Sequence, residues 1–392
     1  MKKTLLGSIA DIQTGPFGSQ LHKEDYVENG TPIVTVEHLG NRVFTEQNLP
    51  MVSDYDKERL NKYVLCEGDI VFSRVGSVDR CSYVDSNHSG WMFSGRCLRV
   101  RPSDKLYPLY LYYYFCMEST KRFVRNIAVG ATMPSINTKL MGEVEISVPS
   151  IDTQKRIATI LSSIDDKIEL NAVINENLEQ QAQAIFKSWF VDFEPFGGVM
   201  PDDWRTGSLS EICKYSKDKV NIEDLTLDTY YSTENMQPNR QGAVKATTLP
   251  SIKQTTACKK GDVLISNIRP YFKKIIYCFA DCGCSTDVLC FVPNRSEYSS
   301  FLYCALYSDK FFDYMVAGSK GTKMPRGDKQ QIMMYPICIP SVAYIEEFNK
   351  AVLPMLETVY TNRLEADSFA MLRDTILPKL MNGEIDVSQV QI

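Results

Sequence analysis

The 392-residue sequence lacks both an export signal and a membrane-spanning segment. Its first residues, MKKTLLGSIADIQ, carry two lysines, but the apolar run ends at Asp11, too soon for the apolar region of a signal peptide. The most apolar block covers residues 107–117 and is shorter than the roughly 18–20 residues that a transmembrane helix needs. These absences predict a soluble, cytoplasmic protein that makes no membrane contact.

Histidine is scarce, and the cysteines do not follow metal-binding spacings. The sequence has 12 cysteines and only three histidines, which are His22, His38 and His88. The one cysteine cluster, Cys278, Cys282, Cys284 and Cys290, contains no paired C-x2-C motif and has no histidine nearby in the sequence. In a long chain without an export signal, we therefore expect reduced thiols in buried positions, and neither disulfides nor a metal site.

Catalytic motifs are also missing. No G-x-G-x-x-G follows a predicted strand, and no P-loop lysine pattern occurs. The N-P-P-Y and D-P-P-Y sequences used by amino-methyltransferases are absent, and PSDK at 102–105 and PDDWR at 201–205 lack the preceding acid that a nuclease needs. The sequence therefore predicts a binding protein and not an enzyme, with no cofactor of its own.

The negative net charge is confined to two segments of the chain. Residues 151–200 and residues 342–392 each carry four basic and eight acidic side chains. By contrast, residues 1–150 are neutral, and residues 201–341 have 18 basic and 15 acidic side chains. The neutral-to-basic segments are suited to a polyanionic ligand, whereas the acidic segments are not.

In place of catalytic motifs the sequence has an internal repeat. VGATMPSIN at 129–137 is followed 191 positions later by KGTKMPRGD at 320–328. Three more landmarks recur in the same order at offsets of 191 to 193: CEGDIVFSRVGSV at 66–78 with KKGDVLISNIRPY at 259–271, YLYYYF at 110–115 with FLYCAL at 301–306, and the Pro-Ser pairs at 149 and 340. The chain is therefore a tandem duplication, and we expect a pseudo-twofold molecule.

The repeated loop predicts a turn. Gly130 and Gly321 should supply backbone freedom, and Pro134 and Pro325 should stiffen the chain that follows. Direct contact of these loops with a ligand is the alternative, favoured in the second copy by three cations, Lys320, Lys323 and Arg326.

Each copy contains two kinds of sequence pattern, which together predict the fold class and the domain boundaries. Short alternating runs punctuated by Gly, Pro, Asn and Asp indicate strands and turns, with helices near 107–126 and 298–316. The last 50 or so residues of each copy are typical of one long helix. We expect an α+β fold with two globular mixed α/β domains, residues 1–150 and 198–341, separated by two helical spacers, residues 151–197 and 342–392.

Both long helices show the heptad rhythm of a coiled-coil seam. Alternating steps of four and three residues connect the seam positions of the first helix, Ile157, Leu161, Ile164, Ile168, Asn171, Asn175, Leu178, Ala182, Ile185 and Trp189. Adding 191 gives Phe348, Val352, Met355, Val359, Asn362, Ala366, Phe369, Arg373, Ile376 and Leu380, where Arg373 is the misfit and Leu372 a candidate replacement. Buried seam asparagines fix register, so Asn171 and Asn362 predict an antiparallel pair that meets near its middle. The alternative is that Asn171 and Asn362 are ordinary polar residues near a solvent-accessible centre of the helices.

Two similar domains on a fixed spacer suit a ligand with repeated geometry, such as the two half-sites of a DNA duplex. The candidate base-contacting residues follow the Gly-Asp strand of each copy and the repeated loop. In the first copy they are Arg74, Ser77, Arg80, Arg96 and Arg99, with Arg101 beside them. In the second copy they are Asn267, Arg269, Tyr271, Lys273, Lys274, Lys323 and Arg326. The alternative for any one of them is an ordinary surface charge at a strand end.

The whole chain resembles the specificity (S) subunits of type I restriction-modification systems. The similar segments are VPSIDTQKRIATILSSIDDKIELN at 148–171, QAIFKSWFVDFEPF at 183–196, MPDDW with LSEI within 200–212, LRDTILPKLMNGEIDV at 372–387, TGPFGSQL at 14–21 and GDIVFSRVGSVDR at 68–80. The resemblance implies that the globular domains are target recognition domains for a split DNA site. It also implies that the helices set the spacing and dock the modification subunits.

The same resemblance implies the partners and cofactors of the complex. Two modification (methyltransferase) subunits would bring S-adenosylmethionine, and restriction subunits would bring ATP-dependent translocation and cleavage, with magnesium on these partners. Two other classes of function stay open at this point. One is a remnant of a fused methyltransferase-nuclease enzyme, and the other is a coiled-coil scaffold that ignores DNA.

The second copy departs from the family pattern at one place. Where the first copy has PSIDTQKRI, the second has PSVAYIEEF and so lacks the Thr-Gln pair. If the pair belongs to the docking surface, the second helix should dock its modification subunit less symmetrically.

Overall fold

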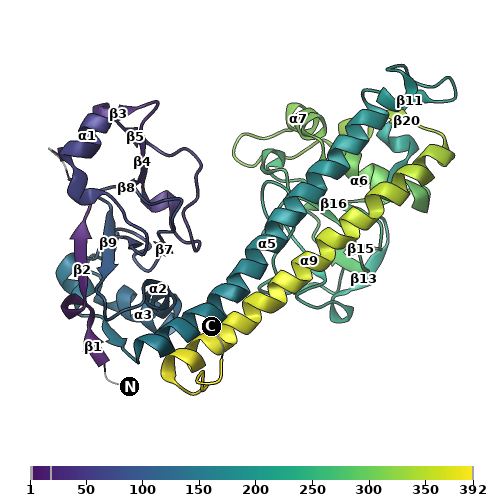
Figure 1. Cartoon of the computed structure of the whole chain (residues 1–392). Helices are drawn as coiled ribbons and strands as arrows, with labels where there is room; N and C mark the ends of the chain where they lie inside the picture. The colour runs from purple at the N-terminus through teal and green to yellow at the C-terminus, as the bar shows by residue number, and fades with distance from the viewer. Residues whose placement is uncertain (1–2, 18–19, 391–392) are drawn as a thin grey trace. The chain divides into compact units, whose positions relative to one another are not determined.

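The computed structural model describes residues 3–17 and 20–390, and the chain divides into two compact units. Unit 1 comprises Met1–Ile168 and Asp367–Ile392, and unit 2 comprises Glu169–Ala366. Each unit contains one copy of the globular sequence and part of each long helix (Figure 1).

The globular part of unit 1 contains ten strands and four short helices among its described residues. The strands are β1 (Lys3–Leu5), β2 (Ala10–Thr14), β3 (Tyr26–Val27), β4 (Thr31–Val34), β5 (Met51–Val52), β6 (Ile70–Ser73), β7 (Cys81–Tyr83), β8 (Met92–Phe93), β9 (Cys97–Pro102) and β10 (Glu145–Ser147). The helices are α1 (Asp54–Arg59), α2 (Pro108–Cys116), α3 (Glu118–Ile127) and α4 (Thr138–Gly142).

Unit 2 repeats this order with one short helix fewer. Its strands are β11 (Arg205–Ser208), β12 (Cys213–Tyr215), β13 (Lys219–Asn221), β14 (Tyr230–Tyr231), β15 (Gln254–Cys258), β16 (Val263–Ser266), β17 (Ile275–Tyr277), β18 (Cys282–Cys284), β19 (Val288–Pro293) and β20 (Pro336–Ile339). Its helices are α6 (Ser299–Tyr307), α7 (Asp309–Ala317) and α8 (Lys329–Met333). The helices predicted near 107–126 and 298–316 are confirmed as the pairs α2–α3 and α6–α7.

The two long helices are α5 (Ile151–Phe190) and α9 (Val342–Asn382). Each starts directly after a Pro-Ser pair. The Ser150 hydroxyl accepts the Thr153 N–H at 3.2 Å and so caps the first turn of α5. Both helices begin where the predicted spacers begin, and the α+β fold class is confirmed. The domain boundaries themselves stay a prediction.

One four-stranded antiparallel sheet, which we call the frame sheet, is the same in both units. Its strand order is β2-β9-β6-β7 in unit 1 and β12-β19-β16-β17 in unit 2. The central strands are buried on both faces: Ile70 and Phe72 of β6 join the larger core, and Val71 joins a smaller core on the other face. Leu264 of β16 occupies the matching place in unit 2. Burial on both faces explains the uninterrupted apolar runs after the Gly-Asp turns.

The second four-stranded sheet, the variable sheet, differs between the units. Its order is β3-β5-β4-β8 in unit 1 and β13-β15-β18-β14 in unit 2. Each variable sheet contains one parallel pair, β4 with β8 and β14 with β18. In unit 1, β5 pairs with β4, whereas in unit 2 the corresponding strand β15 pairs with β18. The duplication has therefore kept one sheet and altered the other.

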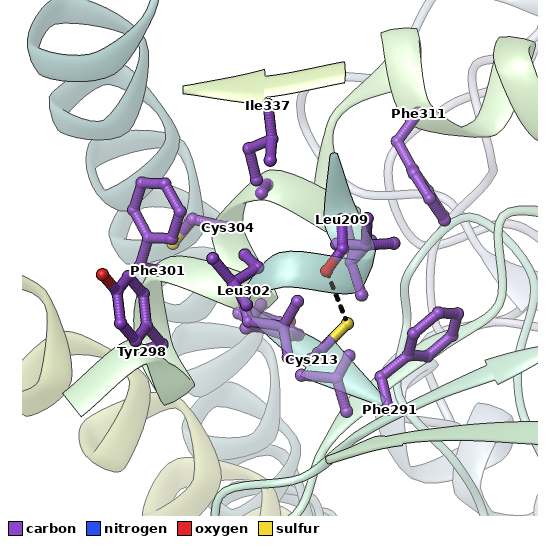
Figure 2. Packing of buried hydrophobic residues seen from close by; sticks show 14 of the residues in the cluster. Leu209, Cys213, Phe291, Tyr298, Phe301, Leu302, Cys304, Phe311 and Ile337 are labelled. Carbon is purple, nitrogen blue, oxygen red and sulfur yellow. Dashed lines mark hydrogen bonds between the residues drawn. The ribbon is translucent and has the colours of Figure 1, made fainter. Parts of the chain in front are cut away.

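The larger core of each unit contains side chains from its own domain and from both long helices. In unit 1, Ile157 and Leu161 of α5 pack with Leu377 and Leu380 of α9. In unit 2, the Phe190 and Phe348 rings meet edge to face with centroids 5.1 Å apart. Figure 2 shows the interior of this second core, where the Cys213 thiol donates to the Leu209 carbonyl at 3.4 Å.

These contacts confirm an antiparallel pairing of the long helices. Unit 1 joins the start of α5 to the end of α9, and unit 2 joins the end of α5 to the start of α9. Within unit 2 the predicted seam asparagines meet: Asn171 Nδ2 donates to the Asn362 carbonyl at 3.3 Å and to Glu365 at 2.8 Å. Asn362 Nδ2 in turn donates to Asn175 Oδ1 at 2.9 Å. That these residues fix the register stays a prediction.

Arg373, the misfit of the predicted seam, lies in the seam after all. Its guanidinium pairs with Asp165 of α5 at 2.8 Å, and the Tyr113 hydroxyl of α2 donates to the same carboxylate at 2.7 Å. Leu372, the suggested replacement, is 47% exposed, so that suggestion was wrong. An arginine is tolerated at this seam position because the Asp165 carboxylate faces it. A pattern of apolar positions alone does not reveal this partner.

The Thr-Gln pair of the first copy belongs to the domain–helix joint. Gln154 is completely buried; its Oε1 accepts the Tyr107 N–H at 2.7 Å, and its Nε2 donates to the Lys105 and Pro149 carbonyls at 3.0 Å each. In the second copy Ile345 fills the same place, also fully buried. The expectation that this departure affects docking has no support here, because the side chain faces its own domain.

Replacing Gln154 with Leu should lower the free energy of unfolding of unit 1 by about 2–3 kcal/mol, because a buried N–H and two carbonyls would lose their partner. The matched control is Ile345→Leu, an isomeric exchange at the equivalent site that should cost less than about 1.5 kcal/mol. Urea unfolding of both variants checks this. Equal effects of the two exchanges would contradict the role of Gln154 in joining α5 to its domain.

Candidate nucleic-acid interface

In unit 1 the backbone after β6 is paired with the repeated loop. Gly76 donates its N–H to the Pro134 carbonyl at 2.8 Å, and Ile136 donates to the Arg74 carbonyl at 3.0 Å. The loop closes on itself through two hydrogen bonds between Val129 and Ser135, at 2.9 and 2.8 Å. The candidate residues that follow the Gly-Asp strand and the repeated loop therefore form one surface.

Unit 2 repeats these bonds at equivalent positions. Arg269 donates its N–H to the Pro325 carbonyl at 2.8 Å, and Gly327 donates to the Asn267 carbonyl at 3.2 Å. Lys320 and Arg326 exchange two hydrogen bonds of 2.9 Å. The repeat noticed in the sequence is thus a repeated backbone junction, which we call the strand–loop junction.

The two loop glycines are required by the backbone. Gly130 has φ of 114° and Gly321 has φ of 100°, values that side-chain-bearing residues rarely adopt. The predicted turn with backbone freedom at these glycines is confirmed. After each loop a side chain caps the next short helix: Asn137 accepts from Leu140 N, and Asp328 accepts from Gln330 N and Gln331 N.

The strand–loop junction of unit 1 borders a cleft of about 660 Å³ that brings together Arg74 and Arg96. The Arg74 guanidinium lies 4.5 Å from the centre of the Phe17 ring and donates to the Gly95 carbonyl at 3.0 Å. Its Nε is buried without a hydrogen-bond partner. Arg96 is exposed. This cleft offers a stacked guanidinium with unused donor capacity, the kind of group that binds base edges or phosphates.

The other candidates of unit 1 fall into two groups. Ser77 and Arg80 are exposed beyond the strand end, with Arg80 donating to the Leu39 carbonyl. Arg99 is only 4% exposed and pairs with Asp11. Arg101 binds the buried Asp69 through two bonds of 2.6 and 2.7 Å. Arg99 is not available at the surface, because its side chain is buried and its guanidinium already pairs with Asp11.

In unit 2, Arg269 and Lys273 flank a tight turn, the 3-10 helix Pro270–Phe272, and Tyr271 lies inside it. Arg269 and Lys273 have φ of 49° and 51°, and both are left-handed without being glycine. Tyr271 is exposed, and its ring centre lies 4.7 Å from that of Phe272 with the two planes tilted by 58°. The turn is held by a neighbouring segment, because Asn239 N donates to the Phe272 carbonyl at 2.8 Å. Such strained, over-determined turns are typical of functional surfaces.

Two predicted lysines of this turn are engaged within the unit. Lys273 pairs with Asp309 at 2.6 Å, and the Lys273 and Arg240 cations together lower the pKa of Asp309 to about 2. Lys274 donates to the Thr233 carbonyl at 2.6 Å, and its partial burial lowers its pKa. Both cations therefore hold the turn in place while lying at its surface.

The remaining candidates of unit 2 lie around its strand–loop junction. Asn267 is buried, and its side-chain Oδ1 has no hydrogen-bond partner. Lys323 is exposed at the loop tip. Arg326 is exposed and pairs with Asp287 at 3.1 Å. The structure thus brings Asn267, Arg269 and Arg326 to one junction. Whether any candidate in either unit contacts DNA stays a prediction.

The cysteine cluster is part of a buried core. Cys278, Cys282, Cys284 and Cys290 are buried in the smaller core of unit 2, and Cys278 and Cys282 lie 3.6 Å apart, sulfur to sulfur. Within residues 3–17 and 20–390, no three His, Cys, Asp or Glu side chains are arranged to hold a metal ion. Among the same residues, no helix is both long and apolar enough to cross a membrane.

The repeated frame sheets, the paired long helices and the two cationic strand–loop junctions define a tandem-repeat binding protein. Residues 1–180 match the family model described as the type I restriction modification DNA specificity domain. This match covers the first 180 of the 392 residues, and it makes the chain similar to the specificity subunits of type I restriction-modification systems.

Two relatives and one solved structure show the extent of the similarity. The chain is 27% identical to the type I restriction enzyme MjaIX specificity subunit of Methanocaldococcus jannaschii, over 74% of this chain and 72% of the relative. It is 23% identical to the HindI specificity subunit of Haemophilus influenzae, over 83% and 88% of the two chains. The S subunit structure from M. genitalium shares the fold, with a TM-score of 0.63 at 18% identity over 97% and 95% of the chains.

Sequence reasoning missed several residues of this surface. The Phe17 ring packs against the Arg74 guanidinium, and its motif TGPFGSQL signals only a family resemblance. Residues 18 and 19 of that motif lie outside the described part. Asn239 and Arg240 form the left-handed turn that holds Phe272 and Lys273. The turn sequence N-R-Q-G was a usable signal for the second case.

Replacing Gly130 with Ala should destabilise the protein more than replacing Gly321 with Ala. Both exchanges force an L side chain into a positive φ, at about 1–3 kcal/mol. At Gly130 the new Cβ would also lie 2.7 Å from the Met133 carbonyl oxygen, whereas the nearest atom at Gly321 is 3.5 Å away. Urea midpoints of the two variants measure the difference, and a larger loss for Gly321→Ala would contradict the junction geometry.

Proposed function

We propose that this chain recognises an asymmetric, two-part DNA target, with one part contacted by each unit, and that it is itself non-catalytic. The observation that carries the proposal is the strand–loop junction, which has the same backbone in both units but different side chains. Arg74 is matched by Asn267, Gly76 by Arg269, and Arg80 by Lys273. Arginine favours guanine because of bidentate geometry in the major groove, and the partly exposed Arg74 and Arg269 stand at different positions of the shared backbone, so the two junctions suit two different half-sites.

The variable sheets support the same division of roles. The frame sheet and the junction are repeated, whereas the second sheet differs in strand order between the units. A shared frame would present each surface to DNA in the same way, and the differing parts would select different bases.

The long helices are proposed to dock two modification subunits and, through these, restriction subunits. Both helices expose apolar side chains outside the seam, including Val173 on α5 and Met371 on α9, which is 72% exposed. Exposed apolar residues on an otherwise acidic helix suit the helices of a protein partner better than they suit DNA. S-adenosylmethionine, ATP and magnesium would be bound by those partners.

The two other classes of function are less well supported. An enzyme remnant would need a paired acid and base or a cofactor loop, and the sequence offers neither. A scaffold that ignores DNA gives no reason for a buried arginine Nε without a hydrogen-bond partner at both strand–loop junctions, Arg74 and Arg269.

Replacing Arg74 with Ala should relax base preference in one half-site only, by about 1–3 kcal/mol for a lost bidentate contact. The target is first read from methylated positions in host DNA by long-read sequencing, and the variant is then tested by the same mapping and by binding to single-substituted duplexes. Arg269→Ala should relax the other half-site.

Arg74→Lys separates base contact from phosphate contact, because lysine keeps the charge but loses the planar fork. It should relax the half-site as alanine does. Arg125→Ala, which removes a surface ion pair with Asp79 in the same unit, is the matched control and should change nothing. A uniform loss across all duplexes with Arg74→Ala, restored by lysine, would show a phosphate contact instead.

Adding one heptad to both long helices, after Ile168 and after Ala366, should lengthen the spacer of the target without changing the half-site letters. Seven residues preserve the seam phase and add about 10 Å, roughly three base pairs of DNA. Mapping of methylated sites measures the spacer. A four-residue insertion, which breaks the heptad phase, should abolish methylation. An unchanged spacer with the heptad insertion would contradict the idea that the helices set the spacing.

A further inference from the structure

Each unit exposes a methionine at the same place in its repeated loop. Met133 is 65% exposed and Met324 is 49% exposed, and they are separated by the repeat distance of 191 positions. Methionine is usually a buried residue, so two matched exposed methionines call for a binding partner. The residues around them differ: the first loop has Ala131 and Thr132, and the second has Thr322 and Lys323.

The loops present these side chains from a fixed backbone. Each methionine stands directly before the proline whose carbonyl accepts an N–H from the segment after the frame strand, Pro134 from Gly76 and Pro325 from Arg269. Each loop is also closed by a pair of hydrogen bonds across its base. A pre-organised loop loses little conformational freedom on binding, so an apolar side chain at its tip contributes efficiently to affinity.

Both loops adjoin segments that carry cations and expose other apolar groups. In unit 1 the loop is bonded to the Arg74 segment and also exposes Val129. In unit 2 the loop itself carries Lys323 and Arg326, and its partner segment exposes Tyr271. An apolar tip beside positive charge is complementary to a polyanion that has apolar sugar and base surfaces, which is nucleic acid.

We propose that Met133 and Met324 make an apolar contact with DNA that is the same at both half-sites and independent of base sequence. The inference rests on the proposed function and extends it. The side chains that differ between the units select bases, whereas the identical methionine places each junction against the sugars or the stacked bases. The methionine is the same at both junctions, and sugars and stacked bases are present at every DNA site.

The test uses the assembled complex of this chain with its modification subunits and fluorescently labelled duplexes, one carrying the mapped target and one with a half-site scrambled. Met133→Gln and Met324→Gln keep the side-chain length but add a polar amide. Each should weaken binding to both duplexes by a similar factor, roughly tenfold or more for the loss of one buried apolar side chain. The dependence of affinity on salt should stay unchanged, since no ionic contact is removed.

Two matched variants control for other effects. Met133→Leu keeps the apolar volume and should retain most of the affinity. Met371→Gln makes the same exchange at an exposed methionine on α9 and should leave DNA affinity unchanged. Because all these side chains are exposed, the variants should fold, and unfolding midpoints verify this.

Three outcomes would overturn the assignment in distinguishable ways. If the glutamine variants bind both duplexes like the parent complex, the methionines do not touch DNA. If assembly with the modification subunits fails while DNA affinity of the assembled fraction is retained, the loops face a protein partner. If the parent complex itself shows no preference for the mapped target over the scrambled duplex, the proposed function fails, and the inference fails with it.

Discussion

The antiparallel contact between α5 and α9 is the interaction on which the rest of the structure depends. Neither core is complete without it: the larger core of unit 1 takes Ile157 and Leu161 from α5 and Leu377 and Leu380 from α9, and the core of unit 2 is closed by aromatic residues of the same two helices. Burying both helices in both units means that a domain and its helices fold as one body. Each domain is therefore held to the long helices by packed side chains.

Polar groups cross this contact in both units. A tyrosine from the domain, a carboxylate on α5 and an arginine on α9 converge in each unit, as Tyr113, Asp165 and Arg373 in unit 1. In unit 2 the Tyr307 hydroxyl and Arg363 both bind Glu179, whose pKa is raised by burial although Arg363 opposes the shift. Such networks add little net stability, but an incorrect register would leave buried charges unpaired, which costs several kcal/mol.

The sequence predicted the elements that depend on periodicity and missed those that depend on contacts between distant segments. Heptad spacing and the 191-residue offset were sufficient for the long helices, their antiparallel pairing and the junction glycines, because each leaves a local pattern. The sequence pattern did not reveal the role of the seam arginine or of the buried Gln154, because these roles depend on a carboxylate on another helix and on backbone groups of the domain. Among the candidate DNA contacts, Arg74 and Arg96 share a cleft, whereas Arg99 faces Asp11, and strand propensity alone cannot separate the two cases.

The measurement that tests the antiparallel seam most directly is site-specific photo-crosslinking along α9. A photoreactive phenylalanine analogue at position 363 should crosslink to the second half of α5, near Glu179, and the same group at position 373 should crosslink to the first half, near Asp165. Mass spectrometry of tryptic peptides distinguishes the two halves. In a parallel seam with the helix starts aligned at 151 and 342, position 373 would instead reach the second half of α5, near residue 182, and that result would contradict the account of both units.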